Sequence, residues 1–243
     1  MRPDVQASFL IPAYNEEGFV GRAVESVHRS VQACGPGACE IIVCDNASTD
    51  ATADIARAAG ARVVVEPHRQ IARARNAAAA ASSGRWLIWL DADAILNEVV
   101  LHGTLSALGS GRICGGGARV HLEGAPLDWA ARRMVAGWNW IARTFDLAAG
   151  SYFFALREGW AGTGGFDERV YAGEELGFSR ALKSWGRPRG QRFHVLDHAV
   201  ASSARKIGQF TTLQLARQIA LCAWPGNRGR RDRCALWYER AHG

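Results

Sequence analysis

The chain has 243 residues, of which 48% are hydrophobic and 21% are charged, a composition that excludes an intrinsically disordered protein. This length allows one large domain with a sizeable buried core. The formal net charge of +6 would suit nucleic acid, an anionic membrane face or a phosphorylated substrate, but no nucleic-acid-binding motif accompanies it, so we expect no nucleic-acid partner.

The N-terminal part of the chain alternates between strand-like and helix-like segments. Short apolar runs predict strands at residues 8–11, 41–44, 63–65 and 86–90. Helical spacing and alanine-rich composition predict helices between them at residues 20–31, 48–59 and 71–81. We expect Ser48 or Thr49 to cap the second helix and Gly60 to end it. This alternation predicts a mainly parallel sheet with helices on both faces.

The second half of the chain has a different pattern. Apolar residues at steps of three and four predict one long amphipathic helix over residues 127–145, with Trp138 in its apolar stripe and Trp140 on another face. A glycine-rich region follows, then a helix at residues 174–185 and a largely apolar helix at residues 207–224 with an arginine-rich tail. Without internal repeats or linkers, we expect one compact unit in two halves.

Polar residues follow three of the predicted strands, at residues 12–17, 45–50 and 91–93. In an open parallel sheet, ligands bind beyond the carboxyl ends of the strands. Three polar strand ends together are therefore more informative than any one of them. For Asp50 we prefer a local role, because it lies where it can support the start of the following helix.

The pair Asp91 and Asp93 directly follows a strongly apolar strand. Alternate residues of an extended segment point the same way, so the two carboxylates can converge. Hard cations such as Mg²⁺ and Mn²⁺ bind oxygen ligands, often one or two carboxylates together with substrate phosphates. The pair therefore predicts a Mg²⁺ or Mn²⁺ site that a nucleotide diphosphate would complete.

Taken in order, these segments resemble the family 2 glycosyltransferases, whose nucleotide-binding fold is called GT-A. The matching segments are residues 11–17, 43–52, 74–76 and 90–93, followed on the acceptor side by residues 164–168 and 173–176. They keep the family's order and roughly its spacing across residues 7–186, about three quarters of the chain.

The resemblance implies an α/β protein with the GT-A fold: a mainly parallel central sheet flanked by helices, with a mixed acceptor-side second half. Residues 1–243 would form a single glycosyltransferase domain. Within it the resemblance implies a nucleotide-sugar-binding half (7–110), an acceptor and catalytic half (111–206), and a C-terminal helix with a basic tail (207–243).

The resemblance further implies an inverting enzyme that moves a sugar from a nucleotide-diphosphate sugar to an acceptor hydroxyl. The metal would stabilise the departing diphosphate while a carboxylate removes the acceptor proton. By family habit the donor base is uracil, with guanine and thymine left open. The acceptor is equally open among a glycan, a lipid-linked sugar and a small molecule.

Roles for single residues follow from the same resemblance. Those for the nucleotide sugar fall on Pro12, Ala13, Tyr14, Glu16, Asp45, Arg75 and Asp91. The first four resemble the loop that holds the nucleoside, Asp45 would hydrogen-bond the base, and Arg75 would contact the nucleotide. Asp91 resembles the ribose or sugar contact, and Asp93 the metal ligand. His198 lies where some relatives supply a further metal ligand, and a satisfied structural histidine is its alternative.

Two departures from the family pattern concern the site. The family usually has Glu-Asp where this chain has Glu174-Glu175, so alignment assigns the base to Glu175, with Glu174 in reserve. The alternative is that both acids only stabilise the first turn of the helix that begins there. Residues 68–70 replace the family's frequent Asn-x-Gly, and Arg69 could there replace or assist Arg75.

Three further features have two interpretations each. A polar and basic cluster, Ser202, Ser203, Arg205 and Lys206, could close over the diphosphate or form a solvated loop. Trp138 is expected in the core, whereas Trp140 is a candidate for stacking on an acceptor sugar. The C-terminal helix and its arginines could rest peripherally on an anionic membrane, or pack against the catalytic domain or a second subunit.

Cysteine use and hydropathy give an expected location. The six cysteines form no CxxC pair and match no zinc spacing, so we expect free buried thiols. No signal peptide and no apolar stretch of membrane-spanning length is recognisable. We therefore expect a cytoplasmic protein, with the inner face of the membrane as its peripheral site if the C-terminal helix binds lipid.

Two other classes compete with the glycosyltransferase interpretation. A nucleotidyltransferase also binds metal and nucleotide on a related sheet, but usually has a glycine-rich basic loop where residues 14–17 read Tyr-Asn-Glu-Glu. A non-catalytic nucleotide-binding assembly partner would be expected to lack Asp93 or the acidic pair, and this chain has both.

Overall fold

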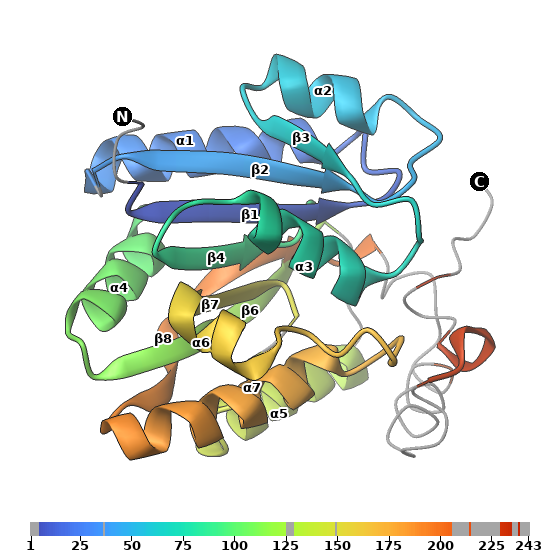
Figure 1. Cartoon of the computed structure of the whole chain (residues 1–243). Coiled ribbons are helices and arrows are strands. Elements are labelled where there is room, and N and C mark those ends of the chain that lie inside the picture. The colour runs from blue at the N-terminus through green and yellow to red at the C-terminus, as the bar shows by residue number, and fades with distance from the viewer. Residues whose placement is uncertain are drawn as a thin grey trace.

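A computed structural model describes residues 5–35, 37–124, 129–148, 150–205 and 229–234, and the single positions 214 and 238 (Figure 1). The strands are β1 (Ala7–Ala13), β2 (Cys39–Asp45), β3 (Arg62–Val65), β4 (Trp86–Leu90), β5 (Ala94–Ile95), β6 (Ile113–Glu123), β7 (Tyr152–Leu156) and β8 (Arg192–Ser203). The helices are α1 (Val20–Cys34), α2 (Thr52–Ala58), α3 (Ile71–Ala81), α4 (Glu98–Gly109), α5 (Trp129–Thr144), α6 (Arg157–Thr163) and α7 (Glu174–Gly186), with short 3₁₀ turns at Arg187–Arg189 and Arg231–Arg233.

All eight strands form one sheet in the order β3-β2-β1-β4-β7-β6-β8-β5. The four strands from β3 to β4 are parallel, as the alternation of strands and helices predicts. Beyond β4 the sheet is mixed: β7 is antiparallel to both β4 and β6, β8 is parallel to β6, and β5 is antiparallel to β8. The expected architecture, a parallel first half continued by a mixed second half, is therefore confirmed.

Helices cover both faces of the sheet because the buried strands are apolar on both sides. In β1, Phe9 and Ile11 join a core with α1 and α4, whereas Leu10 points to the opposite core with α3 and α7 (Figure 1). Trp89 of β4 lies at the centre of the second core, with its ring edge-on to those of Phe153, Phe166 and Phe178.

Within the described residues, the predicted elements agree with the structure except at the start of α2. This helix begins at Thr52 with Ala51 at its N-cap, and neither Ser48 nor Thr49 caps it. Both residues instead hydrogen-bond Asn15 in the loop after β1, so a tertiary contact replaces the local cap. The carboxylate of Asp50 accepts from the backbone N of Thr52 at 3.0 Å, which confirms its expected support of the helix start.

Some expectations fall on residues that the structure does not describe. Of the helix expected at 207–224, the structure describes only position 214. The side chain of Trp138, expected in the core, also lies outside the described residues. Among the described residues, five cysteines are free, as expected, but only Cys44, Cys114 and Cys234 are buried, whereas Cys34 and Cys39 are half-buried. No helix in the described part of the chain is both long and apolar enough to cross a membrane. The expected location and the membrane contact of the C-terminal helix stay predictions.

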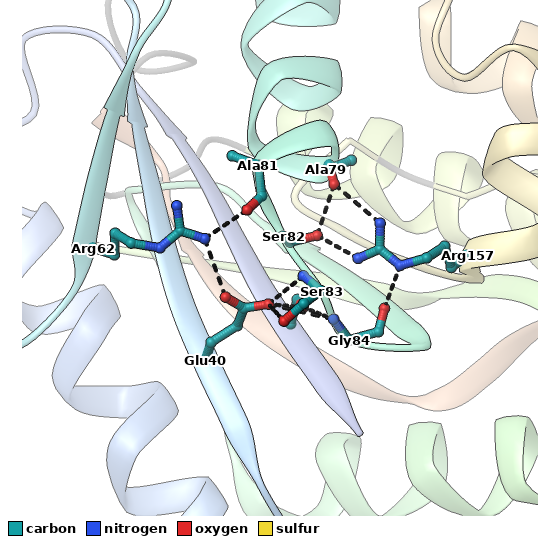
Figure 2. A network of polar contacts seen from close by, with 9 residues as sticks. Glu40, Arg62, Ala79, Ala81, Ser82, Ser83, Gly84 and Arg157 are labelled. Atoms are coloured by element: carbon teal, nitrogen blue, oxygen red, sulfur yellow. Dashed lines mark hydrogen bonds and ion pairs between the residues drawn. The ribbon is translucent and has the colours of Figure 1, made fainter. Parts of the chain in front are cut away.

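A polar network fastens the amino ends of the central strands (Figure 2). One carboxylate oxygen of Glu40 accepts hydrogen bonds from the Ser8 hydroxyl at 2.8 Å, from the amide and hydroxyl of Ser83, and from the Gly84 amide. The other oxygen accepts from Arg62. Burial raises the pKa of Glu40, but these hydrogen bonds outweigh burial and lower it to about 2. The charged carboxylate thus joins β1, β2 and the turn before β4.

Exchange of Glu40 for glutamine should lower the free energy of unfolding by about 1–3 kcal/mol, because several donors lose a charged acceptor. Urea denaturation at neutral pH measures this loss. The folded-state pKa is depressed, so the contribution is present above about pH 4.5 and disappears as the pH falls through about 2. Glu25→Gln, at an exposed position on α1, is the matched control. Equal stabilities of the two variants would contradict the prediction.

Candidate active site

The loops after β1 and β2 are tied together at the carboxyl edge of the sheet. The Asn15 amide donates to the Ser48 hydroxyl at 2.9 Å, and the Glu16 amide donates to the Thr52 hydroxyl at 2.7 Å. Asn15 and Ala47 both adopt positive φ, at 48° and 64°, where the two loops turn. The predicted nucleoside loop therefore lies directly beside the strand end that carries Asp45.

Asp45 and Tyr14 have local partners within these loops. The carboxylate of Asp45 accepts from the Ser48 amide at 3.1 Å and is largely buried. The guanidinium of Arg69 lies over the Tyr14 ring, 3.7 Å from its centroid. This stacking places Arg69 at the predicted nucleoside loop. Its expected role, to replace or assist Arg75, stays a prediction.

Arg75 of α3 lies among three carboxylates. Its side chain is 1% exposed, and its two terminal nitrogens contact Glu174 at 2.8 Å, Glu175 at 2.9 Å and Asp91 at 3.2 Å. It also donates to the carbonyl of Gly150 at 2.9 Å. Burial lowers the pKa of Arg75, but the carboxylates outweigh burial and raise it, so the guanidinium stays charged. One buried cation thus joins the donor-side Asp91 to the acceptor-side acidic pair.

The two acids at the start of α7 differ in exposure. Glu174 is 1% exposed, and burial together with the adjacent Glu175 carboxylate raises its pKa to about 8. One of its carboxylate oxygens contacts Arg75, and the other has no hydrogen-bond partner among the described residues. The side chain of Glu175 remains 13% exposed. Glu175 therefore keeps some access to solvent, whereas Glu174 is enclosed.

The raised pKa of Glu174 predicts a pH dependence of stability. Between about pH 4.5 and pH 8 the folded protein holds a proton at Glu174 that the unfolded chain releases, so stability should fall as the pH rises through this window. The slope from this group is at most about 1.4 kcal/mol per pH unit. Thermal melts of the parent and Glu174→Gln across this range should give curves that diverge with pH, the parent losing more. Parallel curves would contradict the assignment.

Asn76, next to Arg75 on α3, organises the acceptor-side segment that precedes α7. Its side-chain oxygen accepts from the Phe166 amide at 3.0 Å, and its side-chain nitrogen donates to the Phe166 carbonyl at 2.9 Å and to the Glu168 carboxylate at 3.0 Å. The Ala-Arg-Asn segment therefore does two things: Arg75 binds the acidic pair, and Asn76 fixes the loop leading to it.

Gly150 lies against the acidic pair, and a β-carbon at this position would come 2.7 Å from a carboxylate oxygen of Glu175. That contact is too short, but the end of a side chain can move to relieve it. Gly150→Ala should therefore leave the free energy of unfolding nearly unchanged while it displaces Glu175 and lowers turnover, since an error of about 1 Å in a catalytic group can cost about 10²-fold. Urea denaturation and turnover measured on one preparation test this. Gly177→Ala on α7, the helix that carries Glu175, has open space at its β-carbon and is the control.

Asp93 lies beyond the end of β4, two residues after Asp91, where the chain meets the end of β8. Its backbone carbonyl accepts from the Ser203 amide at 3.1 Å, and Asp93 lines a hollow with Phe19, Arg22, Glu123, Ser202 and Ser203, among other residues. The predicted polar cluster of β8 thus adjoins Asp93. Arg205 contacts the buried Glu16 at 2.8 Å and lies over the Phe19 ring, whereas Lys206 lies outside the described residues.

The donor set around Asp93 fits a hard cation that shares its shell with a ligand. No group of three or more His, Cys, Asp or Glu side chains in the described ranges could hold a metal ion alone. One or two carboxylates at a strand end, completed by phosphate oxygens, are a usual arrangement for Mg²⁺. Asp93, with Asp91 two residues away, therefore fits this group only together with a phosphorylated ligand.

His198 is not brought to Asp93. Asp93 lies opposite Ser203, and His198 is exposed five residues earlier on β8, about 16 Å away along a strand. It lies at a register shift, where the pairing of β8 with β6 passes from Leu196 to Ala199. The metal-ligand role of His198 stays a prediction.

Tyr238, near the C-terminal end of the chain, was not foreseen in the sequence. Its hydroxyl accepts from the Ile71 amide at 3.3 Å, its carbonyl accepts from Arg69, and its ring contacts that of Tyr171 edge-on. The tail thus contacts both the loop before α3 and the segment before α7. No local pattern in the arginine-rich tail marks this tyrosine.

The sequence matches the family described as Glycosyl transferase family 2 over residues 8–161. An uncharacterized glycosyltransferase of Mycobacterium tuberculosis is 33% identical over 136 residues, which are 55% of this chain and 53% of that protein. An uncharacterized glycosyltransferase of Rickettsia typhi is 34% identical over 91 residues, 37% of this chain and 29% of that protein. The chain therefore spans about half or less of the length of these curated relatives.

Solved structures show the same fold at low identity. A mannosyltransferase of Pyrobaculum calidifontis, in complex with GDP-Man and Mn²⁺, gives a TM-score of 0.65 with 18% identity over 90% of this chain and 61% of its own. Glucosyl-3-phosphoglycerate synthase of Mycobacterium tuberculosis, in complex with Mn²⁺, uridine diphosphate and phosphoglyceric acid, gives 0.62 with 23% identity over 95% and 78%.

The parallel half-sheet, the polar strand ends and the family match define the class of this protein. The chain belongs to glycosyltransferase family 2 and has the GT-A fold, so the expected family and fold are both confirmed.

Proposed function

We propose that this chain transfers a sugar from a nucleotide-diphosphate sugar to an acceptor hydroxyl with inversion at the anomeric carbon. The observation that carries the proposal is the cluster around Arg75. Asp91, which is expected to contact the donor, binds the buried guanidinium of Arg75. The acidic pair Glu174 and Glu175, which is expected to serve the acceptor, binds the same guanidinium. The reacting ends of both substrates would meet at this cluster.

The donor would be bound by the loops at the carboxyl edge of the sheet. Pro12, Ala13, Tyr14 and Glu16 would hold the nucleoside, with Asp45 on the base and Arg69 beside Tyr14. Asp91, tied to Arg75, would contact the ribose or the sugar. We assign a UDP-sugar as the donor because the mycobacterial synthase and a Staphylococcus aureus relative by fold, TarS, both bind UDP. GDP, bound by the archaeal mannosyltransferase, is the alternative.

Asp93 would hold a Mg²⁺ or Mn²⁺ ion together with the donor diphosphate. When bound, this ion supplies a Lewis acid that neutralises charge on the leaving diphosphate. Ser202 and Ser203 lie next to Asp93 and can donate hydrogen bonds to phosphate oxygens there. Arg205, now bound to Glu16, is close enough to the nucleoside loop to assist them.

Glu175 would remove the proton from the acceptor hydroxyl as the hydroxyl oxygen attacks the anomeric carbon. It keeps some surface exposure, Arg75 holds its carboxylate, and the lack of a side chain at Gly150 leaves room for it. Glu174 would remain enclosed and help to position Arg75. The acceptor is a hydroxyl-bearing molecule whose class, whether glycan, lipid-linked sugar or small molecule, is open.

A thermal-shift panel of nucleotides and nucleotide sugars, each with and without Mn²⁺, tests the proposal. We expect UDP and a UDP-sugar to raise the melting temperature in the presence of Mn²⁺, because ligands that bind only the folded state stabilise it. Asp93→Asn should abolish the metal-dependent part of the shift. A panel in which no nucleotide stabilises the protein with metal present would overturn the proposal.

A further inference from the structure

Helix α5 exposes two tryptophans to solvent. The side chains of Trp129 and Trp140 are 76% and 66% exposed, although most large aromatic side chains are largely buried. The two lie eleven positions apart, so at about 100° per residue they point within about 20° of each other and lie about 16 Å apart along the axis. They therefore form one outward face.

The orientation of α5 is fixed by its inward side. The Asn139 side chain accepts from the Val120 amide at 3.2 Å and donates to the Val120 carbonyl at 3.0 Å, which binds α5 to β6. In Figure 1, α5 lies behind α7 at the bottom of the view, whereas α2 lies at the top. At about 100° per residue, Trp129 and Trp140 lie about 80–100° around the helix from Asn139, so the tryptophan face lies beside the side of α5 that contacts β6 and is exposed to solvent.

Basic residues lie between the two tryptophans. Arg132 and Arg133 are both exposed, and α5 contains no aspartate or glutamate. Tryptophan is favoured at the boundary between headgroups and acyl chains, and each arginine near an anionic bilayer is attracted to its phosphates. A helix with this composition on its outward face fits a flat anionic surface.

We propose that the α5 face formed by Trp129, Arg132, Arg133 and Trp140 docks the protein on an anionic lipid bilayer. Charge disfavours a second copy as the occupant, because a two-fold contact through this face would bring the arginines of both copies together. A glycan would need carboxylate or amide partners beside the aromatic rings, but α5 has no acid and Asn139 is bound to β6. The proposal does not depend on the enzymatic function.

Vesicle flotation without nucleotide tests this proposal. We expect the protein to float with vesicles of phosphatidylcholine mixed with phosphatidylglycerol, and to bind phosphatidylcholine alone much more weakly. Arg132→Ala/Arg133→Ala should weaken binding to the anionic vesicles about 30-fold. Trp129→Ala/Trp140→Ala should weaken it on both kinds of vesicle.

The matched control is Arg29→Ala/Arg57→Ala, which removes the same charge from exposed positions on α1 and α2, on another side of the molecule (Figure 1). It should bind nearly as well as the parent, and unchanged melting temperatures would show that all variants fold. Failure to float with anionic vesicles, equal loss in the control, or full binding by both α5 variants would each overturn the proposal. So would a dimer or soluble-oligosaccharide binding that the α5 variants abolish while vesicle binding persists.

Discussion

Exchange of Glu175 for glutamine is expected to lower the rate of sugar transfer by about 10²–10⁴-fold, the usual contribution of a positioned base. Glutamine preserves the shape of the side chain and can still accept a hydrogen bond from Arg75, but it cannot take up the acceptor proton. Binding of the donor should persist, because Asp45, Asp91 and Asp93 are unchanged. Release of nucleoside diphosphate from the nucleotide sugar that gives the largest thermal shift measures the rate.

Glu174→Gln is the matched control for this experiment, since it makes the same chemical change one position away. Glu174 is enclosed and its raised pKa keeps it protonated over much of the neutral range. Its replacement should therefore lower turnover far less than that of Glu175. The reverse order would move the base to Glu174, and unchanged turnover in both variants would remove the acidic pair from the chemistry.

Exchange of Arg75 for methionine should lower the free energy of unfolding by about 3–5 kcal/mol, the range for removal of one partner of a buried ion pair. Methionine fills much of the same space, so the loss reports the charge: Asp91, Glu174 and Glu175 would remain around a site without a cation. Urea denaturation of the variant and the parent at neutral pH measures the difference.

Arg73→Met on the same helix is the control. Arg73 is 41% exposed and contacts Glu168 at 3.6 Å, so its loss should lower the free energy of unfolding by less than about 1 kcal/mol. Equal losses in the two variants would contradict the role of Arg75.

Local patterns determined the fold of the first half well, because each element there satisfies its own requirements. Apolar runs with a polar residue at the strand end placed β1, β2 and β4, and the alanine-rich segment defined α3 to the residue. The start of α2 could not be read in the same way. Ser48 and Thr49 are good local caps, but their hydrogen bonds go to Asn15, 33 and 34 positions away in the chain.

The second half shows the limit of a sequence pattern more clearly. Strand β6 contains three consecutive glycines and gives no strand signal, but a side chain at Gly116 would lie 1.9 Å from the carbonyl of His194. The close approach of β8 therefore requires glycine there, and that requirement is invisible until β8 is in place. The family resemblance favoured Glu175 over Glu174 as the base, but it could not tell how deeply each carboxylate is buried.

The sequence by itself determined the order of strands and helices in the first half, the family, and most of the residues near the candidate site. Only the tertiary structure decided how those residues are paired, because the pairs come from distant segments: Arg75 with Glu174 and Glu175 across about a hundred positions, and Arg69 with Tyr238 across 169. Burial decided the rest. A carboxylate at the start of a helix reads the same in any sequence, but only the fold shows that Glu174 is enclosed whereas Glu175 keeps 13% of its side chain exposed.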